Sequence, residues 1–232
     1  MPNTQALTGF AIAIDGPASS GKGTVARLVA KELAYAYIDT GSMYRSVALL
    51  ARRQGIPWED EETLAELAES LDFQFSFRDG AFKVVVNGED LSQRIRTEVV
   101  GQGASAVAVQ PMVRTALLGV QRGLAQREGV VLDGRDIGTV VLPDAPLKVF
   151  MDAELVVRAQ RRHTELIARG VEKTVSQVQG ELAARDHQDS SRAIAPLRQA
   201  EDAVYLDTTS LTPETVACKI VALARERGAV DG

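Results

Sequence analysis

The fold of this chain can be predicted from one stretch, Gly16-Pro17-Ala18-Ser19-Ser20-Gly21-Lys22-Gly23-Thr24. An apolar run of residues 10–14 precedes it, and a helix-like pattern of residues 24–30 follows it. Glycines let the backbone turn so that successive N–H groups point into one concavity, and the helix behind them adds a partial positive charge. Lys22 supplies a full charge for the outer phosphates of a nucleotide. The stretch therefore predicts a phosphate-binding loop, or P-loop, between a buried strand and a helix.

Gly23 departs from the general P-loop pattern. That pattern has Ser or Thr after the Lys, so that a hydroxyl reaches magnesium. Here Gly23 follows Lys22, and Thr24 comes one position later. The alternative interpretation is a structural glycine turn ahead of a helix. The strand before the stretch and the helix after it favour the P-loop.

Composition narrows the class of protein. The 232 residues carry a formal net charge of −5, with 45% apolar and 25% charged residues, which is typical of a globular protein with one core. An acidic balance gives no global attraction for nucleic acid, so any polyanion site needs a local concentration of positive charge. The single cysteine, Cys218, excludes a disulfide within the chain and is expected to be a core thiol. A polar N-terminus and the lack of a run of about 18 apolar residues predict a cytoplasmic protein without a membrane segment.

Strand and helix patterns alternate along most of the chain. Alternation of this kind predicts a parallel sheet covered by helices on both faces, a three-layer α/β/α arrangement. The expected strands cover residues 9–14, 37–39, 129–133, 147–151 and 203–206. The expected helices cover residues 22–35, 43–53, 61–70, 111–127, 154–169, 174–188 and 213–227, with another before Pro111.

The spacing of apolar residues changes from helical to alternating within residues 67–108. Residues 73–77 alternate strictly, and residues 82–86 form a second apolar run after the turn signal Asp79-Gly80. This pattern predicts a small antiparallel β-meander, in contrast to the alternating strands and helices on either side of it. We therefore expect an insertion of residues 67–108 in a P-loop core of residues 1–66 and 109–232.

Polar residues follow two of the expected strands. Asp133 ends the apolar run of residues 130–132, where a carboxylate next to the P-loop strand can hold magnesium or its waters. Arg135 and Asp136 come next, at the sheet edge where open α/β sheets bind ligands. Their alternative role is an ion pair within a loop. Thr40, Tyr44 and Arg45 leave the second strand at the same edge, although Arg45 alone is compatible with a solvated helix position.

Arginines concentrate between residues 158 and 198. Their planar donor forks suit phosphoryl oxygens and stay charged, and a single well-placed arginine can contribute about 10³–10⁵ in rate. Asp189 can orient a neighbouring arginine or accept a proton from a sugar hydroxyl. A solvated helix face is the alternative for each arginine taken singly, and it is the favoured interpretation for Arg169. The set comprises Arg158, Arg161 and Arg162 on one helix face, followed by Arg169, Arg185, Arg192 and Arg198.

Four motifs, taken in order, resemble those of the bacterial cytidylate kinases, a family of nucleoside monophosphate kinases. They are residues 16–24 (GPASSGKGT), 39–45 (DTGSMYR), 133–141 (DGRDIGTVV) and 192–197 (RAIAPL). The resemblance covers nearly the whole chain. It implies a P-loop NTPase fold with a helical lid within residues 154–195 and an enlarged monophosphate-binding insertion. It also implies transfer of the γ-phosphoryl group of ATP to CMP or dCMP with Mg²⁺.

The resemblance implies roles for individual residues. Gly16 to Thr24 hold the ATP phosphates. Transfer is assigned to Lys22, Arg135, Arg158, Arg161 and Arg192. No direct metal ligand is expected, with Thr24 and Asp133 acting through water. CMP binding is assigned to Thr40, Tyr44, Arg45, Ser105, Arg114, Arg135, Asp136, Arg185, Asp189 and Arg192.

Cytosine recognition follows from hydrogen-bond polarity. The carboxylate of Asp136 can accept from the exocyclic amine while Arg114 donates to the base acceptors, and uracil reverses the first polarity. The main alternative is another small-molecule kinase of this fold that acts on UMP or AMP. A GTPase is disfavoured because neither asparagine of the chain, Asn3 or Asn87, precedes a lysine as guanine recognition requires. The acidic balance disfavours a nucleic-acid-binding module, and we expect a monomer.

Overall fold

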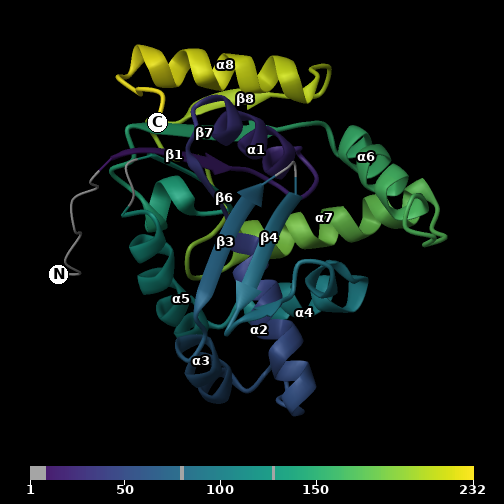
Figure 1. Ribbon diagram of the computed structural model, residues 1–232. Coiled ribbons are helices and arrows are strands. Elements are labelled where there is room, and N and C mark those ends of the chain that lie inside the picture. The colour runs from purple at the N-terminus through teal and green to yellow at the C-terminus, as the bar shows by residue number, and fades with distance from the viewer. Residues whose placement is uncertain (1–8, 79–80, 127–128) are drawn as a thin grey trace.

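The computed structural model describes residues 9–78, 81–126 and 129–232. Its centre is a five-stranded parallel sheet in the order β2–β6–β1–β7–β8. Parallel neighbours require crossovers, and helices supply them (Figure 1). The strands are β1 (Phe10–Asp15), β2 (Ala36–Asp39), β6 (Gly129–Gly134), β7 (Leu147–Asp152) and β8 (Val204–Asp207).

The helices pack in pairs around this sheet. α1 packs against α8, α2 against α4, α3 against α5, and α6 against α7. Two short segments complete the set, the 3₁₀ helix η1 (Arg94–Arg96) and the π-helical η2 (Ile137–Val141). The helices are α1 (Lys22–Glu32), α2 (Thr40–Gln54), α3 (Glu61–Glu69), α4 (Glu98–Val107), α5 (Pro111–Leu124), α6 (Leu155–Ile167), α7 (Val175–Ser191) and α8 (Pro213–Glu226).

Each face of the parallel sheet has its own apolar layer. Successive side chains of β1 point to opposite faces, and Ile12 and Ile14 pack with residues of α1 and α8. Ala11 and Ala13 pack on the other face with η2 and the end of α5. Both faces of the sheet are therefore covered, which confirms the predicted three-layer α/β/α architecture with a parallel sheet.

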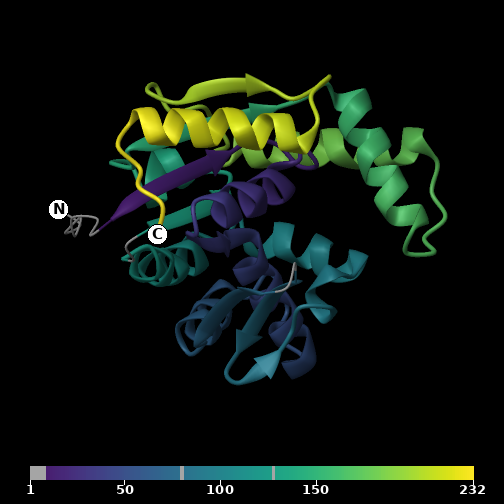
Figure 2. The ribbon, with the colours of Figure 1, turned by 45° about the horizontal axis from the view of Figure 1, so that its top comes forward.

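A second, antiparallel sheet lies apart from the parallel one (Figure 2). It has three strands, β3 (Phe73–Arg78), β4 (Ala81–Val86) and β5 (Glu89–Asp90). Phe73, Phe82 and Val84 are buried beneath it, and the Phe82 ring contacts Tyr37 of β2 at a centroid distance of 4.9 Å. The predicted β-meander is confirmed, whereas the Asp79-Gly80 turn lies outside the described residues.

Two local expectations from the sequence are wrong. Helix α2 begins at Thr40 rather than near Met43, because the Asp39 side chain accepts the Ser42 N–H and caps the helix. Cys218 is exposed, since Val216, Ala217, Ile220 and Val221 form the buried face of α8.

Within the described residues, no single helix is long and apolar enough to cross a membrane. The pair α4 and α5 meets the length and composition criteria only jointly, and its two helices are bent by 100° at their junction. Both helices of this pair pack on other helices of the chain, α4 on α2 and α5 on α3.

Candidate active site

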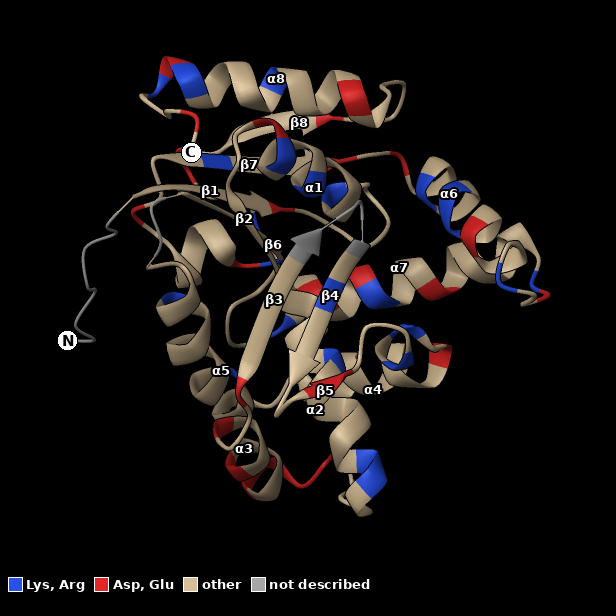
Figure 3. Cartoon of the chain, in the orientation of Figure 1, with Lys and Arg blue, Asp and Glu red and all other residues tan. Residues whose placement is uncertain are grey.

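A cavity of about 700 Å³ opens at the carboxyl edge of the parallel sheet. Residues of the P-loop, of α2, α4 and α5, of the segment after β6, and of α6 and α7 line it. Ten arginines and Lys22 line this cavity against five carboxylates, although the whole chain carries a net charge of −5. Figure 3 shows the charges of both signs interspersed along α6 and α7. Positive charge is thus concentrated where an anionic ligand would lie.

The P-loop wraps the buried head of Lys22. Its Nζ donates to the carbonyl oxygen of Pro17 at 2.6 Å and to Ser20 Oγ at 3.2 Å. Gly16 has φ +145°, and a Cβ there would lie 1.9 Å from the Met151 carbonyl oxygen, so β7 forces a glycine at this position. Burial, and next the neighbouring Arg135, lower the pKa of Lys22 well below its ordinary value. An anion in the loop would restore the charged form.

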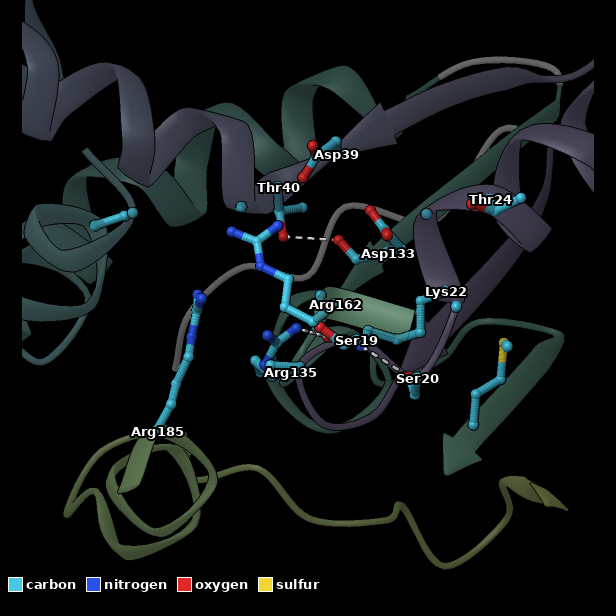
Figure 4. Close-up of a pocket in the computed structure, with 18 of the residues that line it drawn as sticks. Ser19, Ser20, Lys22, Thr24, Asp39, Thr40, Asp133, Arg135, Arg162 and Arg185 are labelled. Atoms are coloured by element: carbon cyan, nitrogen blue, oxygen red, sulfur yellow. Dashed lines mark hydrogen bonds between the residues drawn. The ribbon is translucent and has the colours of Figure 1, made fainter. Parts of the chain in front are cut away.

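Asp133 lies between the P-loop and β2. It is 8% exposed, its Oδ1 accepts from the Tyr37 hydroxyl at 3.2 Å, and its carbonyl oxygen accepts from Thr40 Oγ1 at 2.8 Å. Burial, reinforced by the negative charge of Asp39, raises the pKa of Asp133 to about 7. Figure 4 shows Asp133, Lys22 and Arg135 around one space, with Arg185 reaching toward it from α7.

The oxygen atoms of Asp133 and its surroundings fit the binding of a hydrated magnesium ion. A buried carboxylate without a salt bridge of its own, within the described part of the chain, would be stabilised by a divalent cation. Thr24 offers a hydroxyl nearby, since both residues line the cavity. In the part of the chain that the structure describes, no group of three or more Asp, Glu, His or Cys residues is arranged to hold a metal ion. Water and nucleotide phosphates would have to complete the coordination.

A buried ion pair also lines the cavity. Arg114 Nη2 lies 2.5 Å from Asp136 Oδ2, and both side chains are 9% exposed. A second guanidinium nitrogen of Arg114 donates to the Ala108 carbonyl oxygen at 3.1 Å, and its charge lies 5.5 Å from the Tyr44 ring centroid. Because these contacts fix both partners, the pair presents a defined pattern of donors and acceptors to a ligand.

Three arginines in the cavity lining act on Asp189. Arg135 Nε donates to Asp189 Oδ2 at 2.9 Å, and Arg192 Nη1 lies 3.9 Å from Oδ1. Burial raises the pKa of the Asp189 carboxyl, but Arg135, Arg185 and Arg192 together hold it below its ordinary value. Burial, with the charge of Arg135 next, lowers the pKa of Arg185 to about 10. One carboxylate against three guanidinium groups leaves positive charge for a ligand phosphate.

The family model described as cytidylate kinase matches residues 12–226. The chain belongs to the cytidylate kinase family. A cytidylate kinase from Stutzerimonas stutzeri is 48% identical over 218 residues, which cover 93% of this chain and 95% of that protein. One from Geobacter sp. (strain M21) is 49% identical over 220 residues, which cover 94% of each chain.

A solved structure shows the same fold. An uncharacterized protein from Eubacterium ventriosum matches with a TM-score of 0.51 and 11% identity, covering 93% of this chain and 98% of that one. At this identity the likeness concerns the fold alone. The resemblance to cytidylate kinases predicted from the four sequence motifs is confirmed by the family match.

Most residues predicted for the site line the cavity of this cytidylate kinase family member. From the P-loop these are residues 18–24, and from the other elements they are Thr40, Tyr44, Arg45, Ser105, Arg114, Asp133, Arg135, Asp136, Arg161, Arg185, Asp189 and Arg192. Gly16 and Pro17, the first two residues of the loop, are not part of the lining. Arg45 pairs with Asp39 at 2.6 Å, and Arg161 donates to the Thr208 carbonyl oxygen at 2.6 Å.

Arg158 is the predicted transfer residue that does not line the cavity. It is 6% exposed, and its Nη1 lies 2.6 Å from Asp186 Oδ2 and 3.1 Å from the Ala18 carbonyl oxygen. Arg158 therefore links the P-loop to α7 through Ala18 and Asp186. Its side chain lies outside the cavity lining, and this position does not support direct contact with a transferred phosphoryl group. The interpretation of residues 158, 161 and 162 as one equivalent face missed this, because the register of α6 buries only the first of them.

Several lining residues have no assigned role in the sequence analysis. Arg27 follows Thr24 by one helical turn and donates to its hydroxyl at 3.3 Å, a spacing that could have identified it. Arg96 lies in η1 and Arg169 after α6, and Arg169 donates to the Arg96 carbonyl oxygen at 3.3 Å. Lys173 also pairs with Glu98 of α4. No sequence signal predicts that the α6–α7 connection meets the segment around α4.

Proposed function

We propose that this chain transfers the γ-phosphoryl group of ATP to CMP or dCMP, giving ADP and CDP or dCDP, by direct in-line transfer. Membership of the cytidylate kinase family and about 48% identity to cytidylate kinases over more than 90% of the chain support this reaction. The observation that carries it here is that one cavity is lined both by a P-loop lysine, Lys22, and by the buried pair of Arg114 and Asp136.

The donor end of the cavity suits ATP. The loop of residues 16–24 would hold the β- and γ-phosphates. The ammonium group of Lys22 would stay in contact with the negatively charged oxygens of the γ-phosphoryl group while it is transferred. Mg²⁺ bound with ATP supplies further charge neutralisation, and Asp133 and Thr24 would hold it through water. The acceptor phosphate oxygen is already anionic, so transfer needs no general base. Positioning and fixed positive charge from Arg135, Arg161 and Arg192 carry the catalysis.

The acceptor end suits a cytidine monophosphate. Asp136 would accept from the exocyclic amine of cytosine, while Arg114 and Ser105 face the base acceptors. Arg45 and Arg135 would hold the phosphate, and Arg185 and Asp189 the ribose. The family match and the relatives favour this acceptor over UMP or AMP, because a carboxylate at residue 136 would face a carbonyl of uracil.

Two further features belong to this proposal. Residues 67–108 act as the monophosphate-binding insertion, and helices within residues 154–195 act as a lid that closes to exclude water. The contacts of Arg169 and Lys173 with Arg96 and Glu98 support a lid that meets the insertion over the cavity. The chain works as a cytoplasmic monomer without nucleic acid or membrane partners. Light scattering of the purified protein with and without nucleotides tests the oligomeric state.

Stereochemistry tests the transfer mechanism. ATP made chiral at the γ-phosphorus with oxygen isotopes and sulfur is turned over with CMP, and the product configuration is determined. A single in-line transfer inverts the configuration. Retention would indicate a phosphorylated protein intermediate and would contradict direct transfer.

A further inference from the structure

Asp15, the last residue of β1, has a buried carboxylate that neither the donor site nor the acceptor site uses. It is 5% exposed. Its Oδ1 accepts the Ile137 N–H at 2.8 Å, and its Oδ2 accepts the Gly138 N–H at 2.7 Å. Within the described residues, no lysine or arginine forms a salt bridge with it. Both oxygens therefore serve two successive backbone amides at the start of η2.

The surroundings of Gly138 show how closely this contact is fitted. A Cβ at residue 138 would lie 3.4 Å from Asp15 Oδ2 and 3.2 Å from the Lys148 side chain. The backbone is therefore seated between the carboxylate and the stem of Lys148, which itself pairs with Asp202 at 2.8 Å. An amide at residue 15 could accept only one of the two N–H groups, since its nitrogen is a donor.

The contact begins where the sheet ends. The parallel pairing of β1 and β6 stops at Asp15 and Gly134. The next residue of β1 is Gly16, the first of the P-loop. The residues after Gly134 are Arg135 and Asp136, which line the cavity and to which the proposed function assigns CMP binding. The Asp15 side chain thus replaces the missing ladder hydrogen bonds and joins the donor loop to the acceptor segment.

Burying the charged carboxylate of Asp15 destabilises the folded protein. We therefore look for its role in the arrangement of the site. Burial raises the pKa of the Asp15 carboxyl to about 6, against the lowering effect of the two backbone hydrogen bonds. A polar but neutral side chain of the same shape would avoid this cost. The charged form is instead retained where the strand that leads into the P-loop meets the segment that follows Asp136.

We propose that Asp15 is a positioning residue that sets the separation between the ATP-binding loop and the CMP-binding segment. The inference rests on the proposed function and adds a residue to it. Reacting atoms must approach to about 3–3.5 Å, and a misplacement of about 1 Å can cost about 10²-fold in rate. Loss of the two-point contact leaves each site able to bind its own nucleotide but places the two nucleotides wrongly relative to each other.

A bisubstrate inhibitor provides the test. Such a molecule joins adenosine and cytidine through a chain of five phosphates and needs both sites at the correct separation. For Asp15→Asn we expect kcat to fall about 10- to 100-fold, with dissociation constants for ATP and CMP within about threefold of the wild type. The bisubstrate affinity should fall by more than the product of the two single-nucleotide losses. Asp15→Ala, which removes both acceptor oxygens, should show at least the same excess loss.

Two controls separate the possible outcomes. Asp60→Ala removes the N-cap of α3, far from the cavity, and shows what lost stability alone does to these constants. A purely additive loss of bisubstrate affinity, or an Asp15→Asn variant with wild-type kcat, would overturn the positioning role. A wild-type protein that does not phosphorylate CMP would instead overturn the proposed function itself.

Discussion

Replacing Asp136 by alanine should weaken the acceptor site and leave the donor site unchanged. The structure places this carboxylate 2.5 Å from Arg114, with both side chains 9% exposed. Removing one partner of a buried pair costs about 3–5 kcal/mol. Arg114 keeps the Ala108 carbonyl oxygen and the Tyr44 ring, so we expect the lower end, about 3 kcal/mol. For a chain of this size the melting temperature should fall by about 6–12 °C.

The kinetic effect is expected on one substrate. A hydrogen bond to a charged group is worth about 1.5–3 kcal/mol, so KM for CMP should rise about 10- to 100-fold. KM for ATP should stay within about twofold, since Lys22 and its loop contacts do not involve residue 136. A coupled assay that follows ADP formation, at a temperature well below the lowered transition, measures both constants.

A control variant removes the acidic partner of another buried cation. Asp202 pairs with the buried Lys148 at 2.8 Å, away from the cavity lining. Asp202→Ala should leave both KM values unchanged. Equal rises in KM for CMP and ATP in Asp136→Ala would refute cytosine reading by this carboxylate.

Three further predictions concern the donor site, the metal and pH. Lys22→Ala should lower kcat about 10²–10³-fold while calorimetry shows nearly unchanged CMP binding; near-normal turnover would exclude this P-loop role. Chelation of divalent cations with EDTA should abolish turnover and spare CMP binding, and readded Mg²⁺ should restore activity; undiminished turnover in EDTA would contradict metal dependence. The folded-state pKa of Asp15 is raised from 3.8 to about 6, so its protonation favours the folded state at low pH and this contribution is lost as pH rises through 6. The free energy of unfolding, measured with urea, should therefore fall by about 2–2.5 kcal/mol more for the wild type than for Asp15→Asn between pH 4 and 7, and parallel pH profiles for the two proteins would show that residue 15 does not titrate as described.

The sequence was sufficient for the fold because its signals are local. Residues 10–30 contain the whole strand–loop–helix unit, and the change from helical to alternating period at residues 73–77 marks the second sheet. The start of α2 was less predictable, since only the Asp39 side chain decides whether Thr40 belongs to the strand or the helix.

The site was harder to predict because it depends on contacts between distant residues. Arg158 has the same spacing as its neighbours, and only its pairing with Asp186 shows that it faces inward. Arg96 and Arg169 come together from segments 73 positions apart. Asp15 is an unremarkable strand end in the sequence, and its role depends on amides 122 and 123 residues away.

The most direct test of the central claim is a competition among acceptors. Wild-type protein is given limiting ATP with Mg²⁺ and equal concentrations of CMP, dCMP, UMP and AMP, and the diphosphates formed are separated by chromatography. The arrangement of Asp136 and Arg114 predicts that CDP and dCDP together predominate over UDP at least tenfold, since reversed hydrogen-bond polarity is strongly rejected in a buried polar site. Predominant formation of UDP, or consumption of AMP in preference to CMP and dCMP, would contradict the account.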